Sequence, residues 1–315
     1  MKRQGILCIG ILVILLLNLF GIFFISSHNI SLTTSTSHLS PSSSNSHLTI
    51  SPPSPSLISP HIFVIIRSHY GYRHQLFSLL YSFLSQSIPI SYLHMLILPT
   101  DLPSLTSLSQ YLDQHWDHSI IKNQFFNIQF MNLSSHLFDK YCCQLQSLCN
   151  PSWYHKKLSD GYPHTALTRY CEINNPLHYH LTDLALESVL HSSLLLSNNL
   201  TYQFLIVTNA DNFYSPKFLE LTIQKMNLEN LDLLLTNMIH LGNPMEVAPE
   251  LGKMDLGCAI IRLEFLQKHE IRFVSSLPIP TEPQHWHDAD YWLIHKMIDS
   301  GARVATLPQF LFNHN

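Results

Sequence analysis

Two apolar segments of the sequence each lead into an acidic residue. LHMLILPTD ends at Asp101, and FLIVTNAD ends at Asp211. Open α/β sheets bind ligands outside the carboxyl ends of their strands, although a single Asp at such a place is more often a turn former or a helix cap. Asp288, Asp290 and the late His314 add further oxygen and imidazole ligands, a set that suits Mn²⁺ or Mg²⁺. Such a metal serves a reaction in which a diphosphate leaves, because it offsets the charge on the leaving oxygens.

The elements that must position these residues alternate along the chain. Apolar runs typical of buried strands predict strands over 61–67, 92–98, 126–131, 204–207, 231–236, 256–261 and 303–307. Helical spacing predicts helices over 73–86, 105–116, 181–196, 215–226 and 288–300, with Thr182 as one N-cap and Ser215-Pro216 starting another. This order predicts an α/β fold with a mostly parallel, mixed sheet flanked by helices.

The first 60 residues have a different composition. Lys2 and Arg3 precede an uncharged run from Ile6 to Ile25, which is long enough to span a bilayer with the N-terminus in the cytoplasm. A cleaved signal peptide is the alternative, but its apolar core is shorter and ends at a small-residue site. Residues 26–60, rich in Ser, Thr and Pro, predict a disordered stem. The folded domain is therefore expected over 61–315.

Several features agree with a luminal domain. Asn132 and Asn199 lie in N-glycosylation sequons, and four of the six cysteines cluster in an expected insertion at about 140–180. In an oxidising compartment this cluster predicts one or two disulfides, and Cys258 is expected to be a buried thiol. A net charge of −4 gives no electrostatic footprint for nucleic acid.

From His61 to the C-terminus, with the insertion unmatched, the chain resembles a glycosyltransferase of the GT-A fold. The resemblance rests on segments in the family's order. They are FVIIRSHYGYR for the first strand, LFSLLYSFLSQ for a helix, LHMLILPTD, NAD for the Asp-x-Asp metal motif, DLGCAII, HDADYWLIHKMIDSG for an acidic helix start, and FLFNHN for a final segment with His.

The resemblance implies roles for these positions. Arg67, Asp101, Asn209 and Gly257 would bind the nucleotide or donor sugar, and Asp211 with His314 would hold Mn²⁺ or Mg²⁺. Asp288 would be the general base, with Asp290 as its substitute if the register is off by two. Asp183 would be a donor-binding residue. From the residues alone, Asp183 is as well explained as a first-turn carboxylate interacting with the helix dipole.

The implied activity is transfer of a sugar from a nucleotide-diphosphate sugar to a glycan or glycoprotein, in the Golgi or endoplasmic reticulum membrane. One departure from the pattern matters: Asn209 stands where the family has the first Asp of its metal motif. An amide brings no charge, so a catalytically inactive domain that binds glycans or nucleotides is the alternative. A glycoside hydrolase fits less well, because the element order does not resemble a barrel of eight βα units.

Overall fold

The computed structural model describes residues 60–87, 92–100, 104–115, 126–131, 133, 149–165, 167, 174–196 and 202–314. Every described residue belongs to one compact unit, which begins at Ser56. No helix in these ranges is long and apolar enough to cross a membrane. The predicted membrane segment and stem lie outside the described residues and stay predictions.

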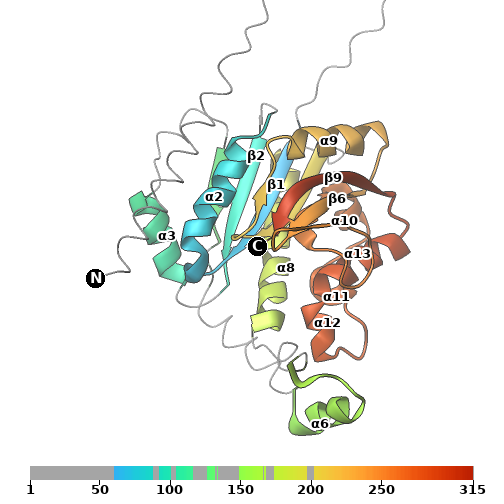
Figure 1. Cartoon of the computed structure of the whole chain (residues 1–315). Helices are drawn as coiled ribbons and strands as arrows, with labels where there is room; N and C mark the ends of the chain where they lie inside the picture. Colours follow the sequence, from blue (N-terminus) through green and yellow to red (C-terminus); the bar gives the residue numbers. More distant parts are fainter. Residues whose placement is uncertain are drawn as a thin grey trace, which may run out of the picture. The chain divides into compact units, whose positions relative to one another are not determined.

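Nine strands in the described ranges form one mixed sheet in the order β3-β2-β1-β4-β8-β6-β9-β5, with β7 paired to β6 (Figure 1). The strands are β1 His61–Ser68, β2 Tyr92–Pro99, β3 Phe126–Phe130, β4 Gln203–Asn209, β5 Phe213–Tyr214, β6 Leu233–His240, β7 Asn243–Met245, β8 Ala259–Arg262 and β9 Val304–His314. The neighbouring strands β3, β2, β1 and β4 are parallel to one another. Strand β8 is antiparallel to both of its neighbours, β4 and β6. The predicted α/β sheet is therefore present as a mixed, Rossmann-like sheet.

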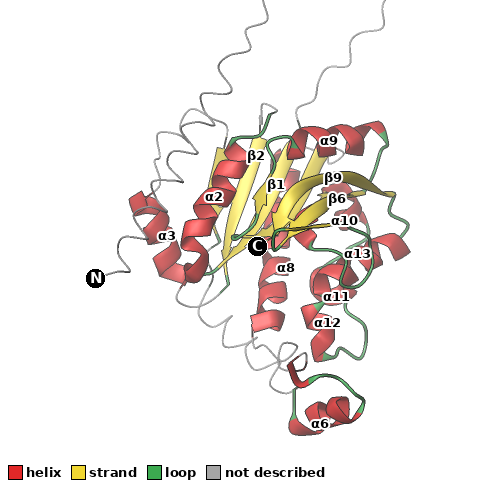
Figure 2. Ribbon diagram, in the orientation of Figure 1, coloured by secondary structure: helices red, strands yellow, loops and turns green. Residues whose placement is uncertain are grey.

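Helices flank this sheet (Figure 2). They are α2 Arg73–Leu84, α3 Ser104–His115, α6 Pro151–Ser159, α8 Asn174–Leu196, α9 Phe218–Leu228, α10 Leu263–Lys268, α11 Phe273–Ser276, α12 Pro283–His287 and α13 Ala289–Asp299, with short 3-10 helices η1 Tyr70–Tyr72 and η3 Leu256–Cys258. The chain steps from β1 through β2 to β3 and then returns past β1 to β4. Because such crossovers are right-handed, α2 and α3 lie on one face of the sheet and α8 lies on the other.

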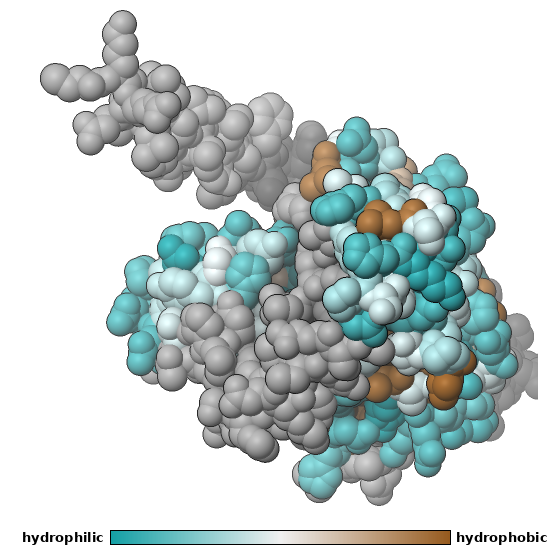
Figure 3. Space-filling model, turned by 90° about the horizontal axis from the view of Figure 1, so that it is seen from below, coloured by the Kyte–Doolittle hydropathy of each residue, from teal (hydrophilic) through white to brown (hydrophobic). Residues whose placement is uncertain are grey.

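Both faces of the central strands are covered, which explains why their sequences do not alternate. Seven of the eight β1 residues are buried, and so are the first six of the seven in β4. The molecular face in Figure 3 is mostly hydrophilic, with hydrophobic residues in a few separate spots. Strands that are buried on both sides hold their carboxyl ends in fixed positions, which suits a site built there.

Three local predictions are wrong. The helix α8 begins at Asn174, so Thr182 lies in its middle, where its hydroxyl donates to the His178 carbonyl oxygen at 2.6 Å. Buried Leu177 and Leu181 continue the apolar face N-terminally and lengthen the helix. The helix α9 begins at Phe218 rather than at Ser215.

The third wrong prediction is the start of the strand predicted over 256–261. Its first three residues form the 3-10 helix η3, because the Asp255 side chain accepts a hydrogen bond from the Gly257 N–H and turns the backbone. Only the last part of the segment pairs in the sheet, as β8. This turn carries Asp255 into the site described below.

The segment LFSLLYSFLSQ, part of the resemblance, ends at Gln86, and this residue has a structural role. Gln86 donates through Nε2 to the Ser215 carbonyl oxygen at 2.9 Å and accepts from the Leu219 N–H at 2.9 Å. The Leu219 N–H is one of the first N–H groups of α9, which have no partner inside the helix. Gln86 therefore joins the end of α2 to the start of α9.

Candidate functional site

Strand direction brings several polar residues to one edge of the sheet. The strands β1, β4, β6 and β9 all run the same way, so their carboxyl ends meet there. The register sets Arg67 beside Asn209 and His240 beside His314. Asp255 reaches the same edge because β8 runs in the opposite direction and η3 precedes it. This edge is where an open α/β sheet is expected to bind ligands.

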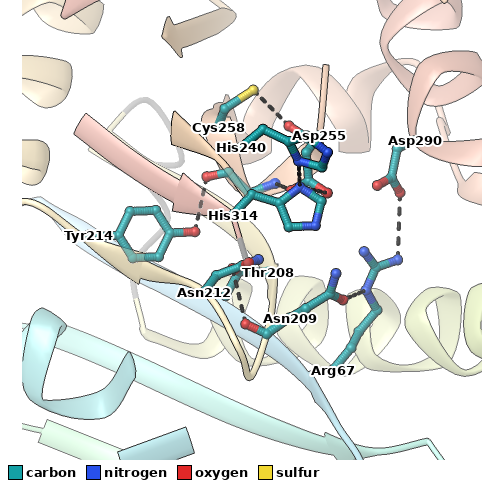
Figure 4. Close-up of polar contacts among 11 residues, drawn as sticks. Arg67, Thr208, Asn209, Asn212, Tyr214, His240, Asp255, Cys258, Asp290 and His314 are labelled. Carbon is teal, nitrogen blue, oxygen red and sulfur yellow. Dashed lines mark hydrogen bonds and ion pairs between the residues drawn. The ribbon is translucent and has the colours of Figure 1, made fainter. Parts of the chain in front are cut away.

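Arg67 is the cation of this group (Figure 4). Its Nε donates to Asn209 Oδ1 at 2.9 Å, its Nη1 lies 3.5 Å from Asp290 Oδ1, and its guanidinium lies 5.4 Å from the centre of the Tyr179 ring. Only 8% of Arg67 is exposed. Burial alone would lower the pKa of Arg67, but the carboxylates of Asp290 and Asp255 raise it above its usual range. A buried positive charge is therefore held at the ends of β1 and β4.

Asp255 lies behind this cation. Its Oδ1 accepts from the Gly257 N–H at 2.7 Å, and its Oδ2 lies 3.7 Å from His314 Nδ1. His314 Nδ1 in turn lies 3.2 Å from His240 Nδ1. Burial raises the pKa of Asp255, while the charges of His314 and Arg67 act in the opposite direction. The carboxylate is thus fixed by the backbone of η3 on one side and approached by an imidazole on the other.

Asp211 occupies the turn after β4, and the Ala210 N–H holds this turn by donating to the Arg67 carbonyl oxygen at 3.0 Å. Burial raises the pKa of Asp211, and the charges of His314, His69 and Arg67 partly counter this rise. The charge of His314 thus acts on Asp211, and the role of the two residues as metal ligands stays a prediction.

Asp288 and Asp290 lie on different sides of α13. The side chain of Asp290 lies next to Arg67, on the same face of the helix as the buried Ile294 and Met297. The side chain of Asp288 instead lies 2.8 Å from His287 Nδ1. Residues two positions apart along a helix are separated by about 200° around its axis. The two carboxylates therefore face different surroundings. Of the two base candidates, the structure brings Asp290 into the Arg67 group.

Asp183 has a different environment from the one the sequence indicated. Its two carboxylate oxygens accept from the Phe273 and Val274 N–H groups at 2.7 and 3.0 Å, at the start of α11. Burial raises the pKa of Asp183 to about 6. The alternative of a first-turn carboxylate is wrong, because Asp183 lies in the middle of α8. The side chain ties α8 to α11, and its role in donor binding stays a prediction.

Several predicted residues lie outside the described residues. They are Asp101, the glycosylation positions Asn132 and Asn199, and the cysteines Cys142, Cys143 and Cys171. Cys149 is described and is not a free thiol, but the pairing within the cysteine cluster stays a prediction. Cys258 is buried and free, as expected.

Among the residues that the structure describes, the predicted metal site has no complete ligand set. No group of three or more His, Cys, Asp or Glu side chains within the described part of the chain is arranged to hold a metal ion. The Asn209 side-chain oxygen, which would have to replace a carboxylate ligand, accepts the hydrogen bond from Arg67. The described residues therefore do not fit the predicted ion, and no chemical step below passes through it.

Sequence reasoning missed several members of this group. Asp255 was overlooked although it stands two residues before Gly257, the spacing of a side chain that caps a backbone N–H. His240 ends an apolar strand, which is the signal that drew attention to Asp211. Tyr179 and His178 lie on α8 and had no such signal. Burial, followed by the charge of Arg67, lowers the pKa of His178 to about 3.

Comparisons with known proteins give similar structures only. No protein-family model and no curated protein sequence matches the chain. S. aureus TarS 1–349 in complex with UDP aligns with 80% of this chain and 59% of its own, at 12% identity and a TM-score of 0.47. Mannosyltransferase PcManGT from Pyrobaculum calidifontis, in complex with GDP-Man and Mn²⁺, aligns with 82% and 57%, at 10% identity and a TM-score of 0.44. The chain thus covers less than two thirds of the length of each of these structures.

Proposed function

We propose that the chain is a glycosyltransferase that moves a sugar from a nucleotide-diphosphate sugar to a glycan or glycoprotein acceptor. The observation that carries this proposal is the convergence of one buried arginine with three carboxylates and a histidine at the carboxyl edge of the sheet. They are Arg67, Asp211, Asp255, Asp290 and His314. Burial raises the pKa of both Asp211 and Asp255, and carboxylates with shifted pKa values gathered at a strand edge are typical of functional sites.

The chemistry of transfer requires a proton acceptor. The acceptor oxygen forms a bond to C1 of the donor sugar, the bond from C1 to the diphosphate breaks, and the proton of the acceptor hydroxyl goes to a carboxylate. Asp290 is the carboxylate that we assign to this step. Its ion pair with Arg67 fixes it at the sheet edge, and it lies in the first turn of α13, where the positive end of the helix dipole favours a negative charge.

The buried cation has a second use in this reaction. A departing diphosphate carries negative charge, and Arg67 is a cation already fixed at the strand ends by Asn209. A group held in place before the reaction stabilises developing charge without reorganising during it. We also propose that the domain lies in the lumen of the Golgi or endoplasmic reticulum, and N-glycosylation at Asn132 or Asn199 is the measurement that tests this placement.

The test is the melting temperature of the full chain in detergent, measured with a panel of nucleoside diphosphates, with Mn²⁺ and with a chelator. A ligand that binds the native state raises the melting temperature by mass action. A rise with one nucleotide supports the donor site and names its class. No rise with any nucleotide, in protein shown to be folded, would remove the transferase proposal and leave a domain that binds glycans alone.

A matched pair of variants tests the base. Asp290→Asn and Asp288→Asn change two carboxylates of one helix end in the same way, and we expect transfer to fall by about 10²–10⁴-fold only in the first. Nucleotide binding by both variants controls for folding. A larger loss in Asp288→Asn would return the role to the residue that the sequence pattern favoured.

A further inference from the structure

A cluster of ring side chains lies beside the Arg67 group and takes no part in it. We call it the α13 ring cluster, and it consists of His285, Tyr291, Trp292 and His295. The ring centres of Tyr291 and Trp292 are 4.9 Å apart, and those of Tyr291 and His295 are 5.5 Å apart. His285 meets Trp292 edge-on, at 5.6 Å. The four rings therefore form one continuous group that joins α12 to α13.

The core accounts for only part of this cluster, because Trp292 packs against it. The buried face of α13 consists of Ala289, Leu293, Ile294 and Met297. All four rings of the cluster are only half-buried, and the His295 side chain is 42% exposed. Residues 288, 291, 292 and 295 have the spacing that places them along one face of a helix. The rings therefore continue from Asp288 along one side of α13, where Trp292 touches the core and Tyr291 and His295 are half-exposed.

The acidic residues around the cluster lie against partner side chains. His295 Nδ1 lies 3.0 Å from Asp299 Oδ2, and His287 Nδ1 lies 2.8 Å from Asp288 Oδ1. Glu282, the N-cap of α12, pairs with Lys157 at 2.9 Å. Ring faces edged with imidazole and phenol groups match a neutral ligand that has apolar C–H faces and many hydroxyls.

The position of the cluster relates it to the proposed reaction. Asp290 lies in the first turn of the same helix, and Tyr291 is the next residue. One turn rises about 5.4 Å, so the near end of the cluster lies within one turn of Asp290 along the helix axis. A ligand lying on the rings would reach the N-terminal end of α13, where both Asp288 and Asp290 are located.

We propose that the α13 ring cluster binds the acceptor as a neutral oligosaccharide, with the sugar that reacts at the N-terminal end of α13. Its assignment as the acceptor subsite rests on the proposed function, whereas oligosaccharide binding by the rings does not. Tyr291 and His295 act in this proposal as residues that position the acceptor.

The experiment compares binding of two ligand classes by the full chain in detergent. The probes are a panel of manno-, chito- and lacto-oligosaccharides of two to six sugars, and the nucleoside diphosphates used above. Tyr291→Ala and His295→Ala remove exposed rings, and Lys296→Ala changes an exposed residue of the same helix outside the cluster. We expect the dissociation constant for the bound oligosaccharide to rise about 2–10-fold in each ring variant, as the loss of one aromatic contact predicts, while nucleotide binding and Lys296→Ala stay as in the wild type.

The outcomes separate the two proposals. Oligosaccharide binding that is unchanged in both ring variants overturns the ring cluster proposal, and so does the absence of oligosaccharide binding by a chain that binds a nucleotide. Oligosaccharide binding that depends on the rings, in a chain that binds no nucleotide, supports the ring cluster and removes the transferase. In an active enzyme, the acceptor KM rises in the ring variants while the donor KM does not.

Discussion

Substitution of Gly257 by Ala tests whether this glycine is needed by the protein's own side chains or by a bound donor sugar. A Cβ atom at position 257 would lie 2.4 Å from Phe312 Cζ and 2.9 Å from Asp255 Oδ1. Both distances are shorter than any contact that carbon tolerates. Phe312 is 1% exposed and its ring lies 5.3 Å from that of Tyr214, whose hydroxyl donates to the Gly257 carbonyl oxygen at 3.0 Å. The added methyl group has no open space to enter.

The expected loss of stability follows from this crowding. Inserting a methyl group into a filled core costs about 1–3 kcal/mol. For a domain of this size that corresponds to a fall in melting temperature of roughly 2–12 °C, at about 2–4 °C per kcal/mol. Donor binding should weaken as well, because the Asp255 carboxylate must move. Thermal unfolding and the nucleotide-dependent shift in melting temperature measure the two effects separately.

A second variant makes the reasoning refutable. Phe312→Leu removes part of the ring that the new methyl group would strike, so the effects of Gly257→Ala and Phe312→Leu should not add, and the double variant should be more stable than their sum predicts. A Gly257→Ala protein that melts like the wild type would refute the crowding argument. If that protein also lost donor binding, the close approach of the backbone to the donor sugar, which the sequence pattern implied, would be the better explanation.

Three further predictions concern stability. Gln86→Ala should cost about 1–3 kcal/mol in a denaturant titration, because α9 loses its partner at the first turn, whereas Gln224→Ala on the exposed side of α9 should change little. The contribution of Asp183 to the free energy of unfolding should fall as the pH rises from 3.8 to about 6. Burial raises the pKa of Asp183 in the folded protein, so this carboxyl ionises at lower pH in the unfolded chain. Asp183→Asn should flatten this part of the profile, and an unchanged slope would contradict the assignment. Asn209→Leu leaves the buried Arg67 Nε without its acceptor and should cost about 1.5–3 kcal/mol, less in an Arg67→Met background; equal costs in the two backgrounds would show that the hydrogen bond contributes nothing.

The sequence by itself determined the main elements and the edge at which to look. Uninterrupted apolar runs predicted β1, β2 and β4 because strands covered on both faces need apolar residues at every position. Gly301 marked the end of α13, and it has the positive φ of 88° that glycine adopts most easily. The resemblance and the strand-end signal together pointed to Asp211, which follows β4, and His314, which ends β9 at the same edge of the sheet.

Only the tertiary structure decided which of these residues meet. The choice between Asp288 and Asp290 depends on how α13 is rotated about its axis, and that rotation is set by packing of Ile294 and Met297 rather than by local sequence. The sequence pattern shows Asn209 only as a residue that replaces a metal-binding Asp. In the structure its side-chain oxygen accepts a hydrogen bond from Arg67, which lies 142 positions earlier in the chain. Contacts between residues so far apart arise when strands pair in the sheet, and the order of that pairing is a property of the whole fold.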